Sequence, residues 1–361
     1  MTIVINNPVL STQIFIAIFL VVLLASIRLK STKELFTLTQ TMELKGLAIL
    51  AVIFSHVGYS LSSDQRFMFP LSIMAGVGVN LFLFLSGYGL VVSALKKDLS
   101  TLEFYRKRLL KLFVSLWLVL SCFFLLDYFA LHIVRDYSYI LRSYFGFFSR
   151  ADLFSDVNSP LWFITPIVFY YLLFPLFFFK QRPWLSAIII YALAYLALHV
   201  PNGVTVDTLH LYELHLVAFP LGIAAASLAN HLATVEIWLE KIKPGAYYLI
   251  VTILLVAIGY TGYYSGVGTS LEQEQWTSLF TMSCLLVLFL IKKIEIRFLS
   301  YFGILAYEIY LVHWPIMSRY DVLFKYLPAW LAMVLYLGLF VGLAELLIRV
   351  NNWLFTPRKN S

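Results

Sequence analysis

The sequence is poor in charge and in cysteine. Only 12% of its 361 residues are charged, about half the roughly 25% of an ordinary soluble domain, and this excludes a soluble enzyme. The two cysteines, Cys122 and Cys284, both lie inside apolar runs, which excludes a disulfide scaffold and gives no indication of the redox compartment. The chain has no phosphate-binding loop, dinucleotide-binding glycine motif, Gly-x-Ser-x-Gly elbow or His-Glu-x-x-His motif. Because these motifs are absent, the soluble enzyme classes that depend on them are excluded.

Apolar sequence fills most of the chain. Hydrophobic residues make up 61% of it and aromatic residues 17%, and the mean hydropathy is +0.87. A helix of about 20 apolar residues crosses a bilayer. We therefore predict an all-α polytopic transmembrane bundle with about eleven spans, near residues 10–27, 45–62, 71–95, 109–130, 160–179, 184–200, 211–229, 246–264, 276–291, 298–317 and 328–350. The segments between these spans are too short to bury a core of their own.

Positive charge is distributed unevenly between the two sides of this predicted bundle. If the N-terminus lies outside, 20 of the 26 Lys and Arg residues fall on the cytoplasmic side, and the six others are Arg66, Arg135, Arg142, Arg150, Arg319 and Lys325. This asymmetry is the one that the positive-inside rule describes, and it places the C-terminus in the cytoplasm. The net charge of +7 is then a topology signal, and nucleic-acid binding loses its support because no basic soluble module is present.

Two ionisable residues share one face of the second predicted span. Lys45 and His56 are eleven positions apart, which places them within about 20° of each other around a helix and about 16 Å apart along it. Lys45 is expected at the cytoplasmic mouth and His56 near the middle of the bilayer. Two interpretations are open: the pair marks the track of a long anionic substrate, or Lys45 snorkels while His56 hydrogen-bonds a neighbouring helix.

The third span and the segment after it carry further polar residues. Asn80 and Ser86 stand among glycines, and glycines are typical of closely packed membrane helices. Six cations follow in one cytoplasmic loop and the start of the next helix: Lys96, Lys97, Arg106, Lys107, Arg108 and Lys111. Such a cluster is interpreted either as a phosphate site or as retained positive charge next to anionic lipid.

The tenth predicted span contains an acid and an imidazole, Glu308 and His313. They are five positions apart and hence about 140° apart around a helix, so each requires a partner on another helix. A set of outer residues shows no established metal-ligand spacing, and we expect no metal there; the set comprises His199, Asp207, His210, Glu213 and His215.

Taken in order, these segments resemble the membrane-bound acyltransferase type 3 family, which includes bacterial glycan O-acetyltransferases. The matching blocks are Lys45–His56, Gly78–Tyr88, Phe104–Lys111, Leu161–Phe163 and Tyr307–His313. Where the family usually has Arg and Asp, this chain has Lys45 and Glu43, and lysine lacks the planar two-pronged grip of arginine. The resemblance implies an additional transmembrane helix and linker over residues 1–42, an acyltransferase type 3 membrane domain over 43–350, and a cytoplasmic tail over 351–361.

The resemblance implies transfer of an acyl group, expected to be acetyl, from cytoplasmic acetyl-CoA to a hydroxyl of an extracytoplasmic glycan or glycolipid at a bacterial plasma membrane. His56 is implied as general base or as the carrier of a covalent acyl group, with Glu308 and His313 as further catalytic residues. Donor binding is implied for Lys45, Arg106, Lys107, Arg108 and Lys111, and acceptor binding for Ser86, Trp162 and Tyr310.

A different class of protein also fits the intramembrane residues. A proton-coupled transporter or flippase for a glycolipid or polar solute uses histidine and glutamate as proton relays. Acetyl-CoA separates the two hypotheses, because a transporter has no reason to bind it or to release its free thiol. The acceptor sugar, the acylated position and the oligomeric state stay open at this point.

Overall fold

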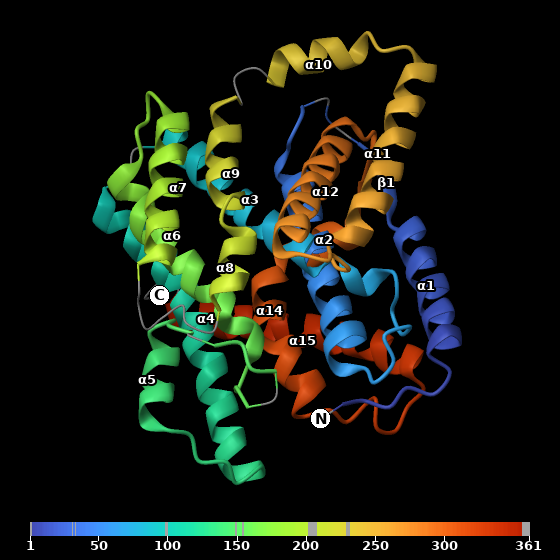
Figure 1. The fold of residues 1–361 in the computed structure, drawn as a ribbon, viewed down its shortest axis with the longest axis vertical. Coiled ribbons are helices and arrows are strands. Elements are labelled where there is room, and N and C mark those ends of the chain that lie inside the picture. Colours follow the sequence, from blue (N-terminus) through green and yellow to red (C-terminus); the bar gives the residue numbers. More distant parts are fainter. Residues whose placement is uncertain are drawn as a thin grey trace, which may run out of the picture.

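The regular structure is almost entirely helical (Figure 1). The computed structural model describes residues 2–30, 32, 34–97, 100–148, 150–153, 155–200, 208–228 and 232–355. The α-helices are α1 (Pro8–Ala25), α2 (Leu38–Ser55), α3 (Ala75–Lys96), α4 (Thr101–Ala130), α5 (Tyr137–Tyr144), α6 (Ile164–Phe177), α7 (Pro183–His199), α8 (Leu209–His215), α9 (Ala218–Ser227), α10 (Leu232–Glu240), α11 (Pro244–Tyr264), α12 (Leu271–Ile291), α13 (Arg297–Ile304), α14 (Ala306–Ser318) and α15 (Ala329–Phe355). Three short helices, η1 (His56–Leu61), η2 (Leu71–Ile73) and η3 (Ser159–Phe163), and two strands, β1 (Ile27–Leu29) and β2 (Ile294–Ile296), complete it.

Nine helical segments of the described chain are long and apolar enough to cross a membrane, which confirms the predicted all-α membrane bundle. The predicted sixth span is the 17-residue apolar helix α7, and the predicted tenth is divided at Leu305 into α13 and α14. Figure 1 shows α5 and the beginning of the described chain at one end of the molecule and α10 at the other, as the predicted topology requires. The number of crossings and their direction stay predictions.

A glycine contact lies just before the point at which the predicted tenth span is divided. A Cβ atom on Gly303 would lie 1.7 Å from the carbonyl oxygen of Met42, and one on Gly46 would lie 1.9 Å from that of Leu299. Helices α2 and α13 therefore touch backbone to backbone, which requires residues without side chains at the crossing. The break at Leu305 follows two residues after this contact, so α13 stays against α2 while α14 begins a separate helix.

Helices α3 and α9 cross in the same way. A Cβ atom on Gly87 would lie 2.3 Å from the carbonyl oxygen of Phe219, and one on Gly222 would lie 2.1 Å from that of Phe84. Glycine at both positions brings the two backbones into direct contact. The interpretation of the third-span glycines as packing residues is therefore correct for Gly87.

The first helix is attached at the edge of the bundle by a strand pair that the sequence patterns did not predict. Strands β1 and β2 are antiparallel, with Arg28 opposite Glu295. Helix α1 packs against α13 and α15, and only 17% of its apolar window is buried. Most of its surface is therefore available to lipid, and in Figure 1 it lies at the right-hand margin.

A buried ion pair and a hydrogen bond fix the start of α2 to strand β2 and to Lys292, which precedes it. The Lys292 ammonium donates to a carboxylate oxygen of Glu43 over 2.6 Å, and the backbone N–H of Ile296 donates to the other oxygen. Glu43 is completely buried, so both of its oxygens require such donors. The acidic residue of the family's first motif therefore has a structural function here.

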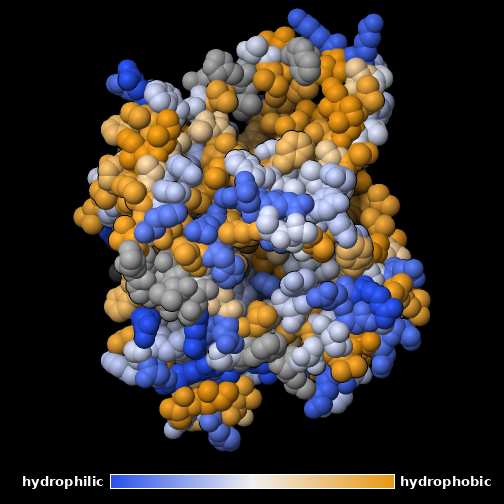
Figure 2. Space-filling view, viewed as in Figure 1, coloured by the Kyte–Doolittle hydropathy of each residue, from blue (hydrophilic) through white to orange (hydrophobic). Residues whose placement is uncertain are grey.

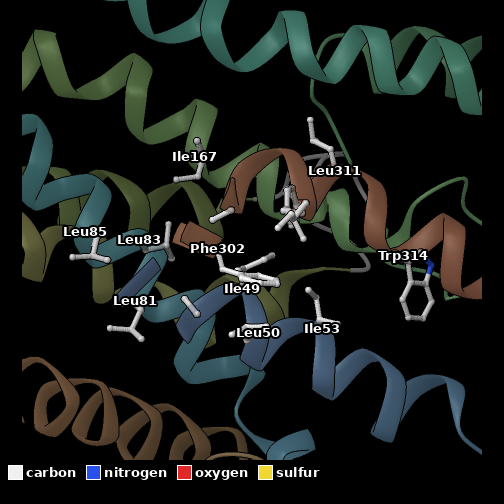
Figure 3. Packing of buried hydrophobic residues seen from close by; sticks show 14 of the residues in the cluster. Ile49, Leu50, Ile53, Leu81, Leu83, Leu85, Ile167, Phe302, Leu311 and Trp314 are labelled. Atoms are coloured by element: carbon white, nitrogen blue, oxygen red, sulfur yellow. The ribbon is translucent and has the colours of Figure 1, made fainter. Parts of the chain in front are cut away.

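The bundle is apolar both outside and inside. Figure 2 shows hydrophobic side chains over α6 and α7 on one flank and over α11 on the other, where a membrane protein meets lipid. Inside, α2 is the most central of the candidate spans, with 72% of its window buried. The labelled residues of Figure 3 show the packing around it: Ile49, Leu50, Ile53, Leu81, Leu83, Leu85, Ile167, Phe302, Leu311 and Trp314.

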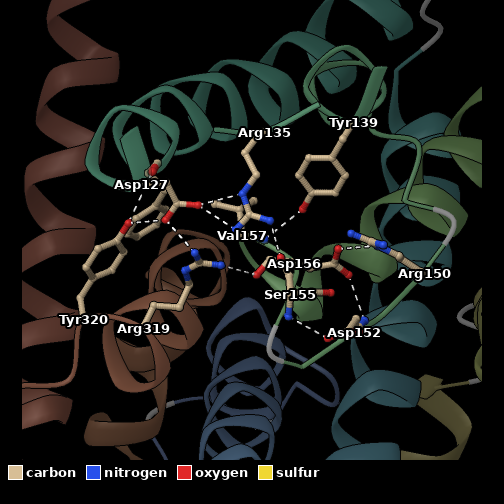
Figure 4. Close-up of polar contacts among 11 residues, drawn as sticks. Asp127, Arg135, Tyr139, Arg150, Asp152, Ser155, Asp156, Val157, Arg319 and Tyr320 are labelled. Carbon is tan, nitrogen blue, oxygen red and sulfur yellow. Dashed lines mark hydrogen bonds and ion pairs between the residues drawn. The ribbon is translucent and has the colours of Figure 1, made fainter. Parts of the chain in front are cut away.

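A network of charges closes one end of α4 and α14 (Figure 4). The completely buried carboxylate of Asp127 accepts hydrogen bonds from Arg135 over 2.8 Å and from the Tyr320 hydroxyl over 2.7 Å, and it forms an ion pair with Arg319 at 3.0 Å. Both guanidinium groups are about 90% buried. In the neighbouring helix α5, burial raises the pKa of Tyr139 to about 12. The network ties α4 to the residues that directly follow α14.

Candidate active site

A large cavity runs along α2 and its π-helical extension η1. Its volume is about 1360 Å³, which exceeds the roughly 300–1,000 Å³ of sites for drug-sized ligands. Met42 and Lys45 line it near the start of α2, and Tyr59 and Ser60 line it in η1. Fifteen residues of helix separate Lys45 from Ser60, or about 20 Å. The cavity is therefore long enough for an extended ligand that reaches from Lys45 to His56.

Ten of the eleven predicted site residues line this cavity, and they come from α2, η1, α3, α4, η3 and α14. The ten are Lys45, His56, Ser86, Arg106, Lys107, Arg108, Lys111, Trp162, Glu308 and Tyr310. The eleventh, His313, is fully buried behind His56. Lys45 and His56 both face the cavity, as their spacing on one helix face predicted.

Two imidazoles meet at the point where α2 changes to the π-helical turn η1. His56 is the first residue of that turn, a type of helix that occurs often at functional sites. Its Nδ1 lies 2.8 Å from Nε2 of His313 in α14, and the two ring planes differ by only 9°. Trp314 packs edge-on against His56, with ring centroids 5.1 Å apart. His56 is thereby held between a hydrogen bond and an aromatic contact.

The surroundings of His313 determine which nitrogens carry protons. Nδ1 of His313 lies 2.9 Å from the carbonyl oxygen of Tyr310 and 3.2 Å from that of Ile309, and a carbonyl oxygen only accepts, so this Nδ1 is the donor. In a neutral His313, Nε2 is then the acceptor, and Nδ1 of His56 donates to it. Nε2 of His56 is left unprotonated, and no described residue hydrogen-bonds to it. This pair of hydrogen-bonded histidines, the His56–His313 relay, thus leaves the basic Nε2 of His56 at the cavity.

Four cations at the other end of the cavity have no counter-ion in the described part of the chain. Lys45 on α2 and Arg106, Arg108 and Lys111 on α4 line the cavity, and none of them forms an ion pair with a described residue. Arg108 and Lys111 are close enough to Lys45 for their charges to repel it. Lys107 differs, because it forms an ion pair with Glu103 at 2.6 Å. Four positive charges that line one cavity, without an ion pair to any described residue, favour a polyanionic ligand.

Glu308 lies apart from the two histidines. It is buried in the first turn of α14, lines the cavity, and is attracted by the charge of Lys111 on α4. The structure supplies a hydrogen-bonded cross-helix partner for His313, which is His56, whereas for Glu308 it shows the attraction of the Lys111 charge and no ion pair with a described residue. Of the three predicted catalytic residues, only the two histidines are in contact.

The three predicted acceptor residues differ in how much of each side chain is free. The Ser86 hydroxyl is 3.0 Å from that of Tyr171, and the pair lines the cavity. Trp162 stacks on His215, with ring centroids 5.9 Å apart and planes 15° apart. The Tyr310 hydroxyl donates to the carbonyl oxygen of Pro160, so this hydroxyl is used to hold η3 against α14.

Comparison with protein families gives one match, to a family model described as an acyltransferase domain, over residues 44–349. The chain belongs to the acyltransferase type 3 family. The match covers the whole cavity wall except three lining residues, which are Met42 on α2 and Asn351 and Asn352 on α15. Comparisons with curated proteins and with solved structures give no match.

His215, which the sequence interpretation placed only among possible outer metal ligands, lines the acyltransferase cavity and contacts Asn80. Nδ1 of His215 lies 2.8 Å from Oδ1 of Asn80, and Nδ2 of Asn80 donates to the Ser278 hydroxyl over 2.9 Å. Asn80 and His215 both occur inside apolar runs, which was the only signal in the sequence. Their contact joins positions 135 residues apart, and helix periodicity does not report such pairs.

The outer residues considered as metal ligands do not form one site in the described chain. No group of three or more His, Cys, Asp or Glu residues there could hold a metal ion. His199 contacts the carbonyl oxygen of Tyr195 within its own helix, and His215 contacts Asn80. Asp207 lies outside the described residues.

Proposed function

We propose that this membrane acyltransferase transfers an acetyl group from acetyl-CoA to a hydroxyl of an extracytoplasmic glycan or glycolipid, with His56 as general base. The observation that carries the proposal is the unprotonated Nε2 of His56, which lacks a described partner and faces the cavity that the free cations enter. The family match supports acyl transfer; the donor, the acceptor and the roles of the residues are the proposal.

The donor end is assigned to the cations at the start of α4. CoA carries a diphosphate and a 3′-phosphate, and lysine and arginine form strong charge-assisted hydrogen bonds to phosphate. Arg106, Arg108 and Lys111, together with Lys45, have their charges free for this contact. The pantetheine arm would then follow α2 from Lys45 toward His56, about 16 Å along the helix axis. This direction brings the thioester to the imidazole.

The proposed reaction is a direct transfer. Nε2 of His56 takes the proton of the acceptor hydroxyl, and the oxygen forms a bond to the thioester carbonyl carbon. The carbon–sulfur bond then breaks, and the departing thiolate takes the proton from His56, which restores the neutral imidazole. General base catalysis of this kind contributes typically about 10²–10⁴ in rate.

His313 is assigned a positioning function. Its Nε2 accepts the Nδ1 proton of His56 and fixes the tautomer that leaves Nε2 of His56 basic. When His56 becomes protonated, the same hydrogen bond becomes charge-assisted and therefore stronger. Glu308, beside Lys111, is assigned to orient the donor-side cations because its carboxylate faces that end of the cavity.

The acceptor is assigned to the end of the cavity formed by η1 and the turn between α11 and α12. This end is lined by the polar side chains of Tyr59, Ser60, Ser265 and Glu274. A surface that faces lipid chains would be apolar, so these side chains suit a polar ligand. Trp162 offers an aromatic face between this end and His56. Aromatic faces and scattered hydrogen-bonding groups together suit the apolar faces and hydroxyl groups of a sugar.

The test is thiol release from acetyl-CoA by the purified full chain in lipid nanodiscs, with and without a crude extracytoplasmic glycan extract. We expect release that requires the extract, accompanied by transfer of radiolabelled acetyl to it. The His199→Ala variant serves as the control, because this histidine is exposed and, among the described residues, its side chain contacts Tyr195 of its own helix. A folded protein that neither binds nor consumes acetyl-CoA would favour the transporter hypothesis instead.

A further inference from the structure

The outer part of the cavity contains a second imidazole with a free acceptor nitrogen. His215 is 4% exposed and lines the cavity. It lies on α8, whereas His56 and His313 lie on η1 and α14. The mechanism proposed above does not use it, and a buried polar group without a partner costs free energy.

A chain of hydrogen bonds determines the protonation of His215. The Ser278 hydroxyl donates to the carbonyl oxygen of Gln275, so its oxygen accepts from Nδ2 of Asn80. The amide is thereby oriented with Oδ1 toward His215, and an amide oxygen only accepts. Nδ1 of His215 is therefore the donor, and Nε2 of the neutral ring is an acceptor. No described residue hydrogen-bonds to this Nε2.

His215 borders the cavity together with Gly76 and Ser265. Gly76 faces the ring, and a Cβ atom on it would lie 3.8 Å from Cε1 of His215 and no closer than that to any other atom. Trp162 stacks on the other side of the imidazole, and its neighbour Phe163 contacts Tyr310, which contacts His313. A series of aromatic contacts therefore runs from His215 to His313, the hydrogen-bond partner of His56, and both His56 and His215 line the same cavity.

We propose that Nε2 of His215 accepts a hydrogen bond from a second, non-reacting hydroxyl of the acceptor, so that the acyltransferase selects polyhydroxylated acceptors over simple alcohols. This inference rests on the proposed acyl transfer at His56. His215 is a positioning residue for one particular class of acceptor. A site that hydrogen-bonds a substrate hydroxyl discriminates strongly against a substrate that lacks it, because the buried group is then left unpaired.

The test compares a sugar with a single-hydroxyl acceptor. Thiol release from acetyl-CoA is measured with methyl glycosides of glucose, galactose and mannose and with 1-propanol, for the wild type and the His215→Ala and His215→Gln variants. For the preferred glycoside we expect His215→Ala to raise KM about 10- to 100-fold, and 1-propanol transfer to stay within twofold. His215→Gln is expected to recover most of the loss, since the amide oxygen accepts a hydrogen bond without acting as a base.

Two results would overturn the proposal. Equal losses with the glycoside and with 1-propanol would mean that His215 acts in the chemical step, and no loss with either would mean that it does not contact the acceptor. The Gly76→Val variant provides a second route to the same site, because it fills the space beside Cε1 and leaves the imidazole in place. We expect it to impair the glycoside reaction more than the 1-propanol reaction.

A binding measurement keeps the inference independent of the acyl-transfer proposal. The melting temperature of the full chain in nanodiscs is recorded with each glycoside and without acetyl-CoA. We expect at least one glycoside to raise it in the wild type and none to raise it in His215→Ala. If thiol release fails but this difference is seen, the donor or the reaction is wrong and the acceptor site stands. If no glycoside stabilises the wild type, the acceptor site is wrong.

Discussion

Nδ1 of His56 donates a hydrogen bond to Nε2 of His313 over 2.8 Å, across 257 positions of the chain. The contact leaves the basic nitrogen of His56 directed at the cavity, because His313 is itself oriented by two backbone carbonyl groups of α14. The proposed chemistry depends on the tautomer as much as on the presence of a histidine. The base, His56, therefore comes from η1, while His313 on α14 determines which of its two nitrogens carries the proton.

Substitution of His313 tests this relay. His313→Leu removes the acceptor for Nδ1 of His56, so the ring loses its fixed tautomer, and we expect kcat to fall about 100-fold with an unchanged KM for acetyl-CoA. His313→Gln offers an amide oxygen in place of Nε2 and is expected to retain more activity. Steady-state thiol release by both variants checks this, and equal activity of His313→Leu and the wild type would contradict the relay.

The free cations should control donor affinity. We expect Arg108→Gln and Lys111→Gln to raise the KM for acetyl-CoA about 10-fold each, because each loses a charge-assisted contact with phosphate. Arg349→Gln is the matched control, since Arg349 is exposed and its ion pair among the described residues is with Glu345 of its own helix. The measurement is KM at two salt concentrations. A KM that does not depend on salt, or one that shifts equally in the control, would remove the phosphate assignment.

Substitutions of Lys45 test whether donor binding depends on the positive charge of this side chain or on its shape. The family usually has arginine at this position, and Lys45 lies among repelling cations at the cavity wall. We expect Lys45→Arg to keep or improve donor affinity and Lys45→Met to weaken it at least 10-fold, as the positive charge is what both cationic side chains share. Binding of acetyl-CoA measured by calorimetry decides. Full affinity in Lys45→Met would show that this residue is only a topology charge.

The Asp127 network should stabilise the fold and thereby the position of α14. Asp127→Ala leaves two buried guanidinium groups without their carboxylate, and removing one partner of a buried pair costs about 3–5 kcal/mol. Thermal unfolding in nanodiscs measures the change. Asp64→Asn is the control, because Asp64 pairs with Arg66 in an exposed loop and its loss should leave the melting temperature unchanged. Similar melting temperatures for both variants would contradict this account.

Glycine at the crossing of α2 and α13 should be required for packing. Gly303→Ala would bring a methyl group into the backbone of Met42, and overpacking of a tight contact costs about 1–3 kcal/mol or more. Gly338→Ala in α15 is the control, since a Cβ atom there meets no atom within 4 Å. We expect only Gly303→Ala to lower the melting temperature. Wild-type stability of that variant would mean that the helices separate without cost.

Much of the fold and of the candidate site follows from local pattern. Apolar runs of helix length predict the bundle, and the 3.6-residue period correctly places Lys45 and His56 on one face that lines the cavity. The same period correctly excludes a local pair between Glu308 and His313. These predictions succeed because each concerns a single helix, whose geometry depends only on its own residues.

The features that pattern did not predict all join distant segments. The partner of His313, the contact of His215 with Asn80, and the strand pair β1–β2 each depend on how helices are arranged in space. The division of the tenth span was not predicted either, and it lies two residues after Gly303, which packs against the backbone of α2. Hydrophobic periodicity identifies a buried face but does not say which helix covers it.

The most direct test of the central claim is single-turnover thiol release by His56→Asn beside the wild type, both with acetyl-CoA and glycan extract in nanodiscs. Asparagine can still donate to His313 in place of Nδ1 but has no basic nitrogen in place of Nε2. We predict a folded protein that binds acetyl-CoA with unchanged affinity and releases thiol at least 100-fold more slowly. Release at the wild-type rate would contradict the assignment of His56 as the base, and an acceptor-independent burst of thiol in the wild type would contradict direct transfer.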